Sequence, residues 1–261
     1  ELRYQKTCPK SNCYSYRHNM VSLIDLVLQC ITSVLFYKPP MPIPTPKIDD
    51  ETYGLGTFIY KSVDGSVAAS AGRKEVAAHG VTVAHIKKDA SGQFQLVQGS
   101  PLNRRVTGAT PMEISGPARG DAKMVTKYSP DGTRTRGTLN NCGNGYTPWG
   151  TYLTAEENWA GYFMNADAAQ PREHKRYGVA TKNGRYSWET ADSGADQYQR
   201  FNASTIATDS NRDYRNEPNH FGWIVEIDPF APESVPVKRT ALGRFAHEGL
   251  VFAPVKSGRP V

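Results

Sequence analysis

Cysteine is scarce in this sequence, and the motifs of several common enzyme classes are missing. The 261 residues contain no CxxC pair and no cysteine–histidine spacing of a zinc site. We therefore expect neither a disulfide framework nor a structural zinc, although the first two of the four cysteines are close enough in sequence to pair. A GxSxG elbow, a P-loop, an HExxH helix and a dinucleotide-binding glycine motif are also absent. A Ser–His–Asp hydrolase thus has no starting point here. The cysteines are Cys8, Cys13, Cys30 and Cys142.

Strong charge of one sign is also missing. Lysine and arginine number 31 against 25 acidic residues, which gives a net charge of +6. This excess suits an anionic partner such as a phosphate ester, nucleic acid or an acidic membrane surface. The basic residues are dispersed, with no basic helix and no stripe interleaved with aromatic residues. We therefore do not expect nucleic acid as a specific partner.

Only one long apolar run is present, at Met20–Tyr37, between basic residues and a proline-rich segment at 39–46. Asp25 lies inside the run, which is short for a membrane span and is followed by no small-residue cleavage site. We therefore favour a buried helix or an irregular segment over a signal peptide, and we expect no stable membrane insertion. The change in composition predicts an atypical N-terminal segment over 1–50 and one domain over 51–261.

Long amphipathic helices are lacking, whereas 23 glycines and 18 prolines separate short alternating segments. One helix is predicted at Ser66–Ala78, ending at Gly80. Residues 160–218 are polar and weakly periodic, as in an inserted loop region. Repeated hairpins favour an antiparallel all-β architecture, either a propeller or a large sandwich. A strand at the C-terminal end lacks a closing partner, so we expect a fragment of a larger domain. The predicted strands are 57–61, 81–86, 93–97, 122–127, 135–139, 149–154, 223–227 and 250–252.

The segment with the densest functional chemistry is 140–158, where a glycine-rich loop carries Cys142 and leads into a strand that ends at Glu156 and Glu157. Neighbouring strand residues point to opposite faces, so only one of the two carboxylates shares a site with the thiol. A thiolate with carboxylates suits iron, because calcium prefers oxygen ligands alone. On residue types alone, a buried structural cysteine beside solvated glutamates is the simpler interpretation.

Three weaker candidates accompany this segment. The pair His247–Glu248 lies in an apolar, strand-like run and is either a metal site or a surface pair. The pair Arg104–Arg105 precedes a glycine-proline turn and either binds phosphate or serves solubility. Glu226 and Asp228 share one strand face, which either holds calcium or is solvated.

Taken together, the chain resembles the PhoX family of bacterial alkaline phosphatases over roughly residues 70 to 260. The cysteine–TPWGT–Glu-Glu segment is long and idiosyncratic, which makes the similarity specific, whereas residues 1–50 do not resemble the family. The matching stretches are AAHGVTV at 77–83, NRRVTGATPMEISGPARG at 103–120, NNCGNGYTPWGTYLTAEEN at 140–158, HFGWIVEIDP at 220–229 and GRFAHEG at 243–249.

The resemblance implies a partial β-propeller with antiparallel blades, long polar loop insertions and a few short helices. Its central channel would hold Fe3+ and Ca2+ ions bridged by oxygen, and the protein would hydrolyse phosphate monoesters. Cys142 and Glu157 correspond to iron ligands and Glu248 to a further metal-site carboxylate, while Glu156 would support these ligands. From their residue type, and not from the resemblance, Arg104 and Arg105 are candidates to contact the substrate phosphate.

The resemblance also implies a monomer that acts in the periplasm or outside the cell. Further arginine and acidic residues of the family's phosphate pocket would lie beyond Val261, so we expect the chain alone to be inactive. Two other functions remain open. One is a different calcium-dependent propeller hydrolase, a lactonase or phosphotriesterase, that does not need Cys142. The other is a propeller-like binding protein without catalysis.

Overall fold

The computed structural model describes residues 31–35, 51–58, 69–191 and 195–253, and most of its regular structure is β. A first, five-stranded sheet has the order β1-β2-β3-β4, and β5 pairs with the other part of β3. All its pairs are antiparallel, and helix α1 (Ala69–Ala78) leads into β3. Its strands are β1 (Ile31–Leu35), β2 (Glu51–Phe58), β3 (Gly80–Lys88), β4 (Phe94–Leu96) and β5 (Arg104–Thr107).

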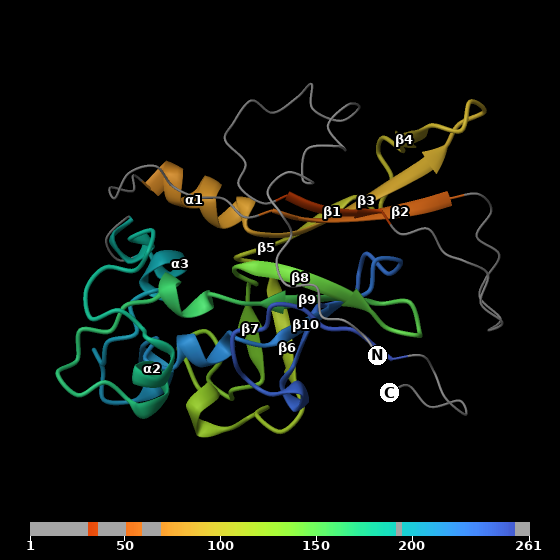
Figure 1. The fold of residues 1–261 in the computed structure, drawn as a ribbon. Helices are drawn as coiled ribbons and strands as arrows, with labels where there is room; N and C mark the ends of the chain where they lie inside the picture. Colours follow the sequence, from red (N-terminus) through yellow and green to blue (C-terminus); the bar gives the residue numbers. More distant parts are fainter. Residues whose placement is uncertain (1–30, 36–50, 59–68, 192–194, 254–261) are drawn as a thin grey trace, which may run out of the picture.

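A second, six-stranded sheet lies below the first in Figure 1 and has the order β7-β6-β11-β10-β9-β8. Its pairs are antiparallel except for β6 with β11. Neither sheet closes on itself in the described part of the chain. The strands are β6 (Pro111–Ser115), β7 (Arg134–Arg136), β8 (Asn141–Tyr146), β9 (Tyr152–Glu156), β10 (Ile224–Ile227) and β11 (Val237–Arg239).

Alternating side chains from the two sheets form a shared core. Val81 and Val83 of β3 and Val106 of β5 are at most 3% exposed, because every second residue of a strand faces the same side. They pack against apolar residues of the second sheet, which joins the two layers. These partners are Met112, Tyr152, Val225 and Ile227.

A second core lies in the region beside the sheets, where α2 and α3 appear in Figure 1. The prediction of irregular loops over 160–218 agrees with its short helices and turns, yet the region also buries a large aromatic cluster. The cluster comprises Trp159, Tyr162, Phe163, Tyr186, Trp188, Phe201 and Phe221, with Val76, Leu139 and Val179. The helices are α2 (Arg172–Tyr177) and α3 (Asp196–Gln199). The 3₁₀ turns of the described residues are Ala122–Met124, Trp159–Tyr162, Trp188–Thr190, Ser210–Arg212, Glu217–His220 and Thr240–Leu242.

Two of the predicted strands are wrong. Residues 122–124 form a 3₁₀ turn, because the Asp121 carboxylate accepts the Lys123 N–H at 2.8 Å and caps it; the strand that pairs with β7 is β6 instead. Residues 250–252 belong to no ladder, although Leu250 and Phe252 pack against the outer face of the second sheet. Strands β1, β5, β6, β8 and β11 were not predicted.

The helix prediction is correct at its C-terminal end. Gly80 follows α1 with φ +104°, and a Cβ there would overlap the Val106 carbonyl oxygen, so only glycine fits. The predicted start at Ser66 and the end of the strand 57–61 fall outside the described residues. The apolar run Met20–Tyr37 lies outside them too, apart from β1. No helix in the described ranges is long and apolar enough to span a membrane.

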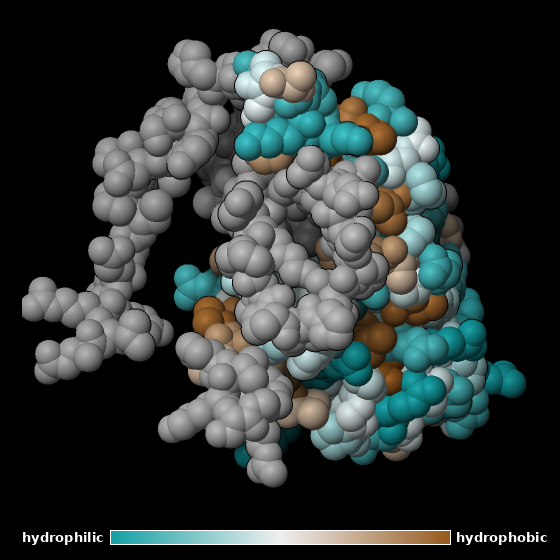
Figure 2. Space-filling model, turned by 90° about the vertical axis from the view of Figure 1, so that its right-hand side faces the viewer, coloured by the Kyte–Doolittle hydropathy of each residue, from teal (hydrophilic) through white to brown (hydrophobic). Residues whose placement is uncertain are grey.

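The face drawn in Figure 2 shows hydrophobic residues as separate patches among hydrophilic ones. Three large apolar side chains near the β8–β9 turn and the C-terminal end of the described chain are well exposed. They are Tyr146, Trp149 and Val251, with exposed fractions of 63%, 60% and 91%.

Candidate metal centre

The β8–β9 hairpin brings the only described cysteine next to a carboxylate. Asn141 and Glu156 pair across the ladder, and a register shift follows at Cys142 and Gly143. Glu157 follows Glu156 and lies on the opposite face of β9. The Glu157 N–H donates to the Asn140 carbonyl at 3.1 Å, which extends this pairing by one residue. The Cys142 thiol is hydrogen-bonded to the Glu157 side chain. Two positions that are fifteen residues apart in sequence (157 − 142) are therefore in contact.

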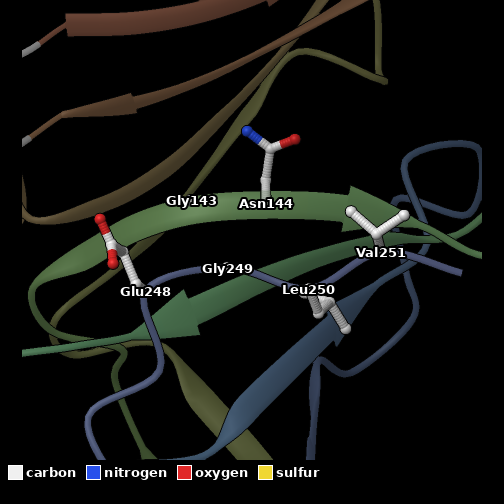
Figure 3. Close-up of a pocket in the computed structure, with 6 residues that line it drawn as sticks. All are labelled: Gly143, Asn144, Glu248, Gly249, Leu250 and Val251. Atoms are coloured by element: carbon white, nitrogen blue, oxygen red, sulfur yellow. The ribbon is translucent and has the colours of Figure 1, made fainter. Parts of the chain in front are cut away.

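The segment that carries Glu248 lies against β8. The Gly143 N–H donates to the Glu248 carbonyl at 2.5 Å, and a Cβ on Gly143 would overlap that oxygen, so the close approach requires glycine. A pocket of about 440 Å³ lies between the two segments (Figure 3). Its lining residues are Gly143, Asn144, Glu248, Gly249, Leu250 and Val251. Figure 3 shows the Glu248 side chain pointing back along β8 toward the start of that strand.

The surroundings of the Cys142 thiol favour its protonated form. Partial burial, the hydrogen bond to Glu157 and the charges of Glu157 and Glu248 raise the pKa of the Cys142 thiol to about 11. A bound cation would reverse this effect, because metal binding deprotonates a coordinating thiol. Within the described ranges, no three His, Cys, Asp or Glu side chains form a complete ion site by themselves. The cluster thus provides a few donors rather than an enclosed cage.

Glu156 points to the other face, as strand alternation predicts. Its carboxylate accepts from Lys238 Nζ at 2.8 Å, from the Gly222 N–H at 3.0 Å and from the Trp223 N–H at 3.2 Å. Both charged side chains are 0% exposed. The structure therefore gives Glu156 three protein partners and does not bring its carboxylate to Cys142.

The family model of alkaline phosphatase PhoX matches residues 50–261. The chain belongs to the PhoX family. The structure of Pseudomonas fluorescens PhoX in complex with vanadate, a transition state analogue, is similar, with a TM-score of 0.71 and 38% sequence identity. The similarity covers 87% of this chain and 37% of that one, so this chain spans little more than a third of its solved relative. None of the curated proteins matches the chain.

Membership of the PhoX family confirms the resemblance that the sequence motifs predicted. It also confirms the fold class, because the mostly β chain with open sheets corresponds to part of a propeller-like PhoX fold. The long polar region and the few short helices agree with that prediction. The one parallel pair, β6 with β11, departs from the expected antiparallel pattern.

The two arginines that residue chemistry suggested for phosphate binding, Arg104 and Arg105, lie in β5 of the first sheet and bond to the protein. Arg104 donates to the carbonyls of Leu102 and Pro229, both at 3.1 Å, and to that of Asp228. Arg105 donates to Thr82 Oγ1 and to the Ala78 carbonyl, both at 2.8 Å. These bonds tie β5 to the end of α1 and to the segment after β10. The structure does not bring the two guanidinium groups to Cys142.

The remaining sequence candidates also have protein partners in this PhoX chain. Glu226 accepts from Trp149 Nε1 at 3.0 Å, from Thr151 Oγ1 at 2.5 Å and from Arg239 Nε at 2.6 Å. The Asp228 carboxylate accepts the Phe230 N–H at 2.9 Å and closes a local turn. The two carboxylates thus do not stand as an open calcium pair.

Sequence reasoning missed two residues that shape the site. Asn140 has a left-handed φ of 52°, and its side-chain oxygen accepts the Asn158 N–H at 2.8 Å, which fixes the chain on both sides of Glu157. An asparagine before a glycine-rich strand is a recognisable signal for such a conformation. Lys238 gives no such signal, because a lysine between a valine and an arginine in a short strand usually faces solvent.

Proposed function

We propose that this protein hydrolyses phosphate monoesters, with Cys142, Glu157 and Glu248 as ligands of a metal cluster that contains Fe3+ and Ca2+. Membership of the PhoX alkaline phosphatase family supports the reaction, and so does the likeness to a PhoX solved with vanadate. We further propose, on the family alone, a monomer that acts on small phosphate esters in the periplasm or outside the cell.

The donor set at the β8–β9 hairpin fits these metals. A thiolate suits iron, while carboxylate oxygens suit both iron and calcium. Burial, then the neighbouring Glu157 and Glu248 carboxylates, raise the pKa of the Cys142 thiol, and a bound cation would lower it again. The observation that carries the proposal is the Cys142 thiol of β8 beside Glu157 at the end of β9, with the backbone of Glu248 bonded to β8 and its charge acting on the thiol.

Each of the three residues has a task that follows from its position. Cys142 is partly buried and serves as a ligand rather than a nucleophile, because a metal-bound thiolate has its lone pairs engaged. Glu157 accepts the hydrogen bond of the Cys142 thiol and so holds the thiol in place before it loses its proton on metal binding. Glu248 is exposed at the pocket beside Gly143, where a phosphate ester has room to approach. When bound, the metal ions supply Lewis-acid stabilisation of the charge that develops on the phosphate oxygens.

The Cys142→Ser variant tests this proposal in the full-length protein. Iron and calcium contents are measured after reconstitution, and turnover of p-nitrophenyl phosphate is followed in parallel. We expect iron affinity and turnover to fall more than about 100-fold. This exceeds the usual effect of changing a residue that only hydrogen-bonds to a metal ligand.

The matched control is Glu226→Gln, which changes a carboxylate already bound by Trp149, Thr151 and Arg239 and so should keep its metals. Iron binding and full turnover in the serine variant would refute the proposal. Hydrolysis of lactones or phosphotriesters that does not depend on Cys142 would instead establish the calcium-dependent alternative. Absence of stoichiometric metal and of any turnover in the wild type would favour a binding protein.

A further inference from the structure

Each of the three proposed ligands is adjacent in sequence either to Glu156 itself or to a residue that contacts Glu156. Glu157 follows Glu156 directly. Cys142 follows Asn141, which is the ladder partner of Glu156. Glu248 follows His247, whose N–H donates to the Glu156 carbonyl at 3.0 Å. One buried residue is thus linked to each of the segments that carry the thiol and the two carboxylates.

The side chain of Glu156 adds a fixed reference point from β10. Its carboxylate accepts the N–H groups of Gly222 and Trp223, while its own N–H donates to the Trp223 carbonyl at 3.3 Å. Backbone bonds in both directions fix the end of β9 against the start of β10. A carboxylate with several charge-assisted bonds has little freedom to rotate.

Lys238 completes this arrangement from β11. Its ammonium donates to Glu156 at 2.8 Å and to the His220 carbonyl at 2.8 Å, and it lies 3.7 Å from the centre of the Phe221 ring. A fully buried ion pair generally adds little stability over an apolar pair of similar volume, because desolvation offsets the attraction. We therefore explain the Glu156–Lys238 pair by its effect on geometry: it fixes the position of the Glu156 side chain.

We infer that Glu156, paired with Lys238, is a positioning residue that holds Glu157 and Glu248 at the right distance from the Cys142 thiol. This inference rests on the proposed metal site and goes beyond it, because Glu156 itself touches neither metal nor substrate. Its neutral analogue should leave the hydrogen-bond acceptor for Gly222 and Trp223 in place. It should also remove the charge that faces Lys238.

The test compares Glu156→Gln with Glu217→Gln in the full chain. Glu217 is a matched control, since it is also 0% exposed and pairs with buried Arg200 at 3.2 Å, but it is not bonded to the segments at 142, 157 or 248. Fe3+ is titrated in the presence of Ca2+, and the thiolate-to-iron absorption band is recorded at a temperature where both variants are folded. We expect Glu156→Gln to bind iron 10- to 100-fold more weakly, roughly the loss seen for residues that orient metal ligands, with an altered band. Glu217→Gln should keep the wild-type band and affinity.

Hydrogen exchange of the metal-free wild type provides a readout that needs neither metal nor variant. The Gly222, Trp223 and His247 amides should be strongly protected, since each donates to Glu156. Exchange as fast as in exposed loops would overturn the inference, even if the glutamine variant does not fold. Equal iron binding by both variants would overturn it while leaving the proposed function intact. A wild-type protein that binds no iron would refute the proposed function, and the exchange pattern would still decide whether Glu156 anchors the segments.

Discussion

Two adjacent glutamates at the end of β9 have opposite environments. Glu156 is completely buried, and its carboxylate is bound by Lys238 and by two backbone N–H groups. Glu157 is half-buried, and its carboxylate lies beside a thiol and near the charge of Glu248. We call the face of β9 that carries Glu156 the closed face, because its charge is buried and neutralised. The face that carries Glu157, beside the Cys142 thiol, is the open face.

This contrast indicates which of the two carboxylates to associate with chemistry. Charges that a fold needs for its own structure are buried with counter-charges and have their hydrogen bonds satisfied. Carboxylates that lie together at an accessible surface beside a thiol are typical of sites that bind a ligand. By this criterion we expect the face of Glu157, and not that of Glu156, to be the functional one. Three further experiments test this contrast.

The largest effect on stability is expected from Lys238→Met on the closed face. The substitution leaves the Glu156 carboxylate buried without its counter-charge, which should lower the free energy of unfolding by about 3–5 kcal/mol. Urea denaturation of the metal-free protein measures this loss. Lys87→Met, at an exposed position of β3, is the control and should change stability by less than about 0.5 kcal/mol. If Lys238→Met lowered the free energy of unfolding no more than this control, the buried Glu156–Lys238 pair would not be important for stability.

An intermediate effect on stability is expected when the pH is lowered, because a buried histidine then has to bind a proton. His79 is 1% exposed; its Nδ1 donates to the Glu75 carbonyl at 2.7 Å, and its Nε2 is bonded with the Tyr162 hydroxyl at 3.0 Å. Burial lowers the pKa of His79 to about 4, so the unfolded chain binds the proton first as the pH falls below 6.5. This contribution is fully present above pH 6.5 and is lost progressively down to about pH 4, for a total of about 3 kcal/mol.

The measurement for His79 is the unfolding free energy of wild type and His79→Gln between pH 6.5 and 5. Wild type should lose about 2 kcal/mol more than the variant over this interval. Buried His174 and His220, whose pKa values are also lowered by burial, act in both proteins and cancel in the comparison. If the unfolding free energies of the two proteins changed in parallel with pH, His79 would not be the source of the acid-dependent loss.

The sequence predicted the fold class because local patterns determine much of it. The strands near 81–86, 93–97 and 223–227 follow from alternating apolar residues. Strand β8 was taken for a loop, since its glycines weaken a strand pattern and are explained only by the backbone of 248–250 lying against it. The predicted strand at 122–127 failed because a single capping bond from Asp121 outweighed the pattern.

The site was predictable only in part. Strand alternation alone separates Glu156 from Glu157, and the family motif adds Glu248, which no spacing rule would place beside β8. Lys238 lay outside such reasoning, because its burial arises from strand pairs distant in sequence, β11 with β10 and β10 with β9. The bonds of Arg104 to the segment after β10 have the same long-range origin.

The smallest effect on stability is expected from Glu157→Gln on the open face. The substitution removes one of two like charges near Cys142 and keeps a group that can accept the thiol hydrogen bond. Half-exposed charges interact weakly through solvent, so the free energy of unfolding of the metal-free protein should change by less than about 1 kcal/mol, toward stabilisation. Urea denaturation beside Glu156→Gln provides the contrast, since the same chemical change one residue earlier removes a buried counter-charge and should destabilise the protein. A larger loss from Glu157→Gln than from Glu156→Gln would reverse the roles of the two faces, because the carboxylate that the fold depends on would then be the one beside the thiol.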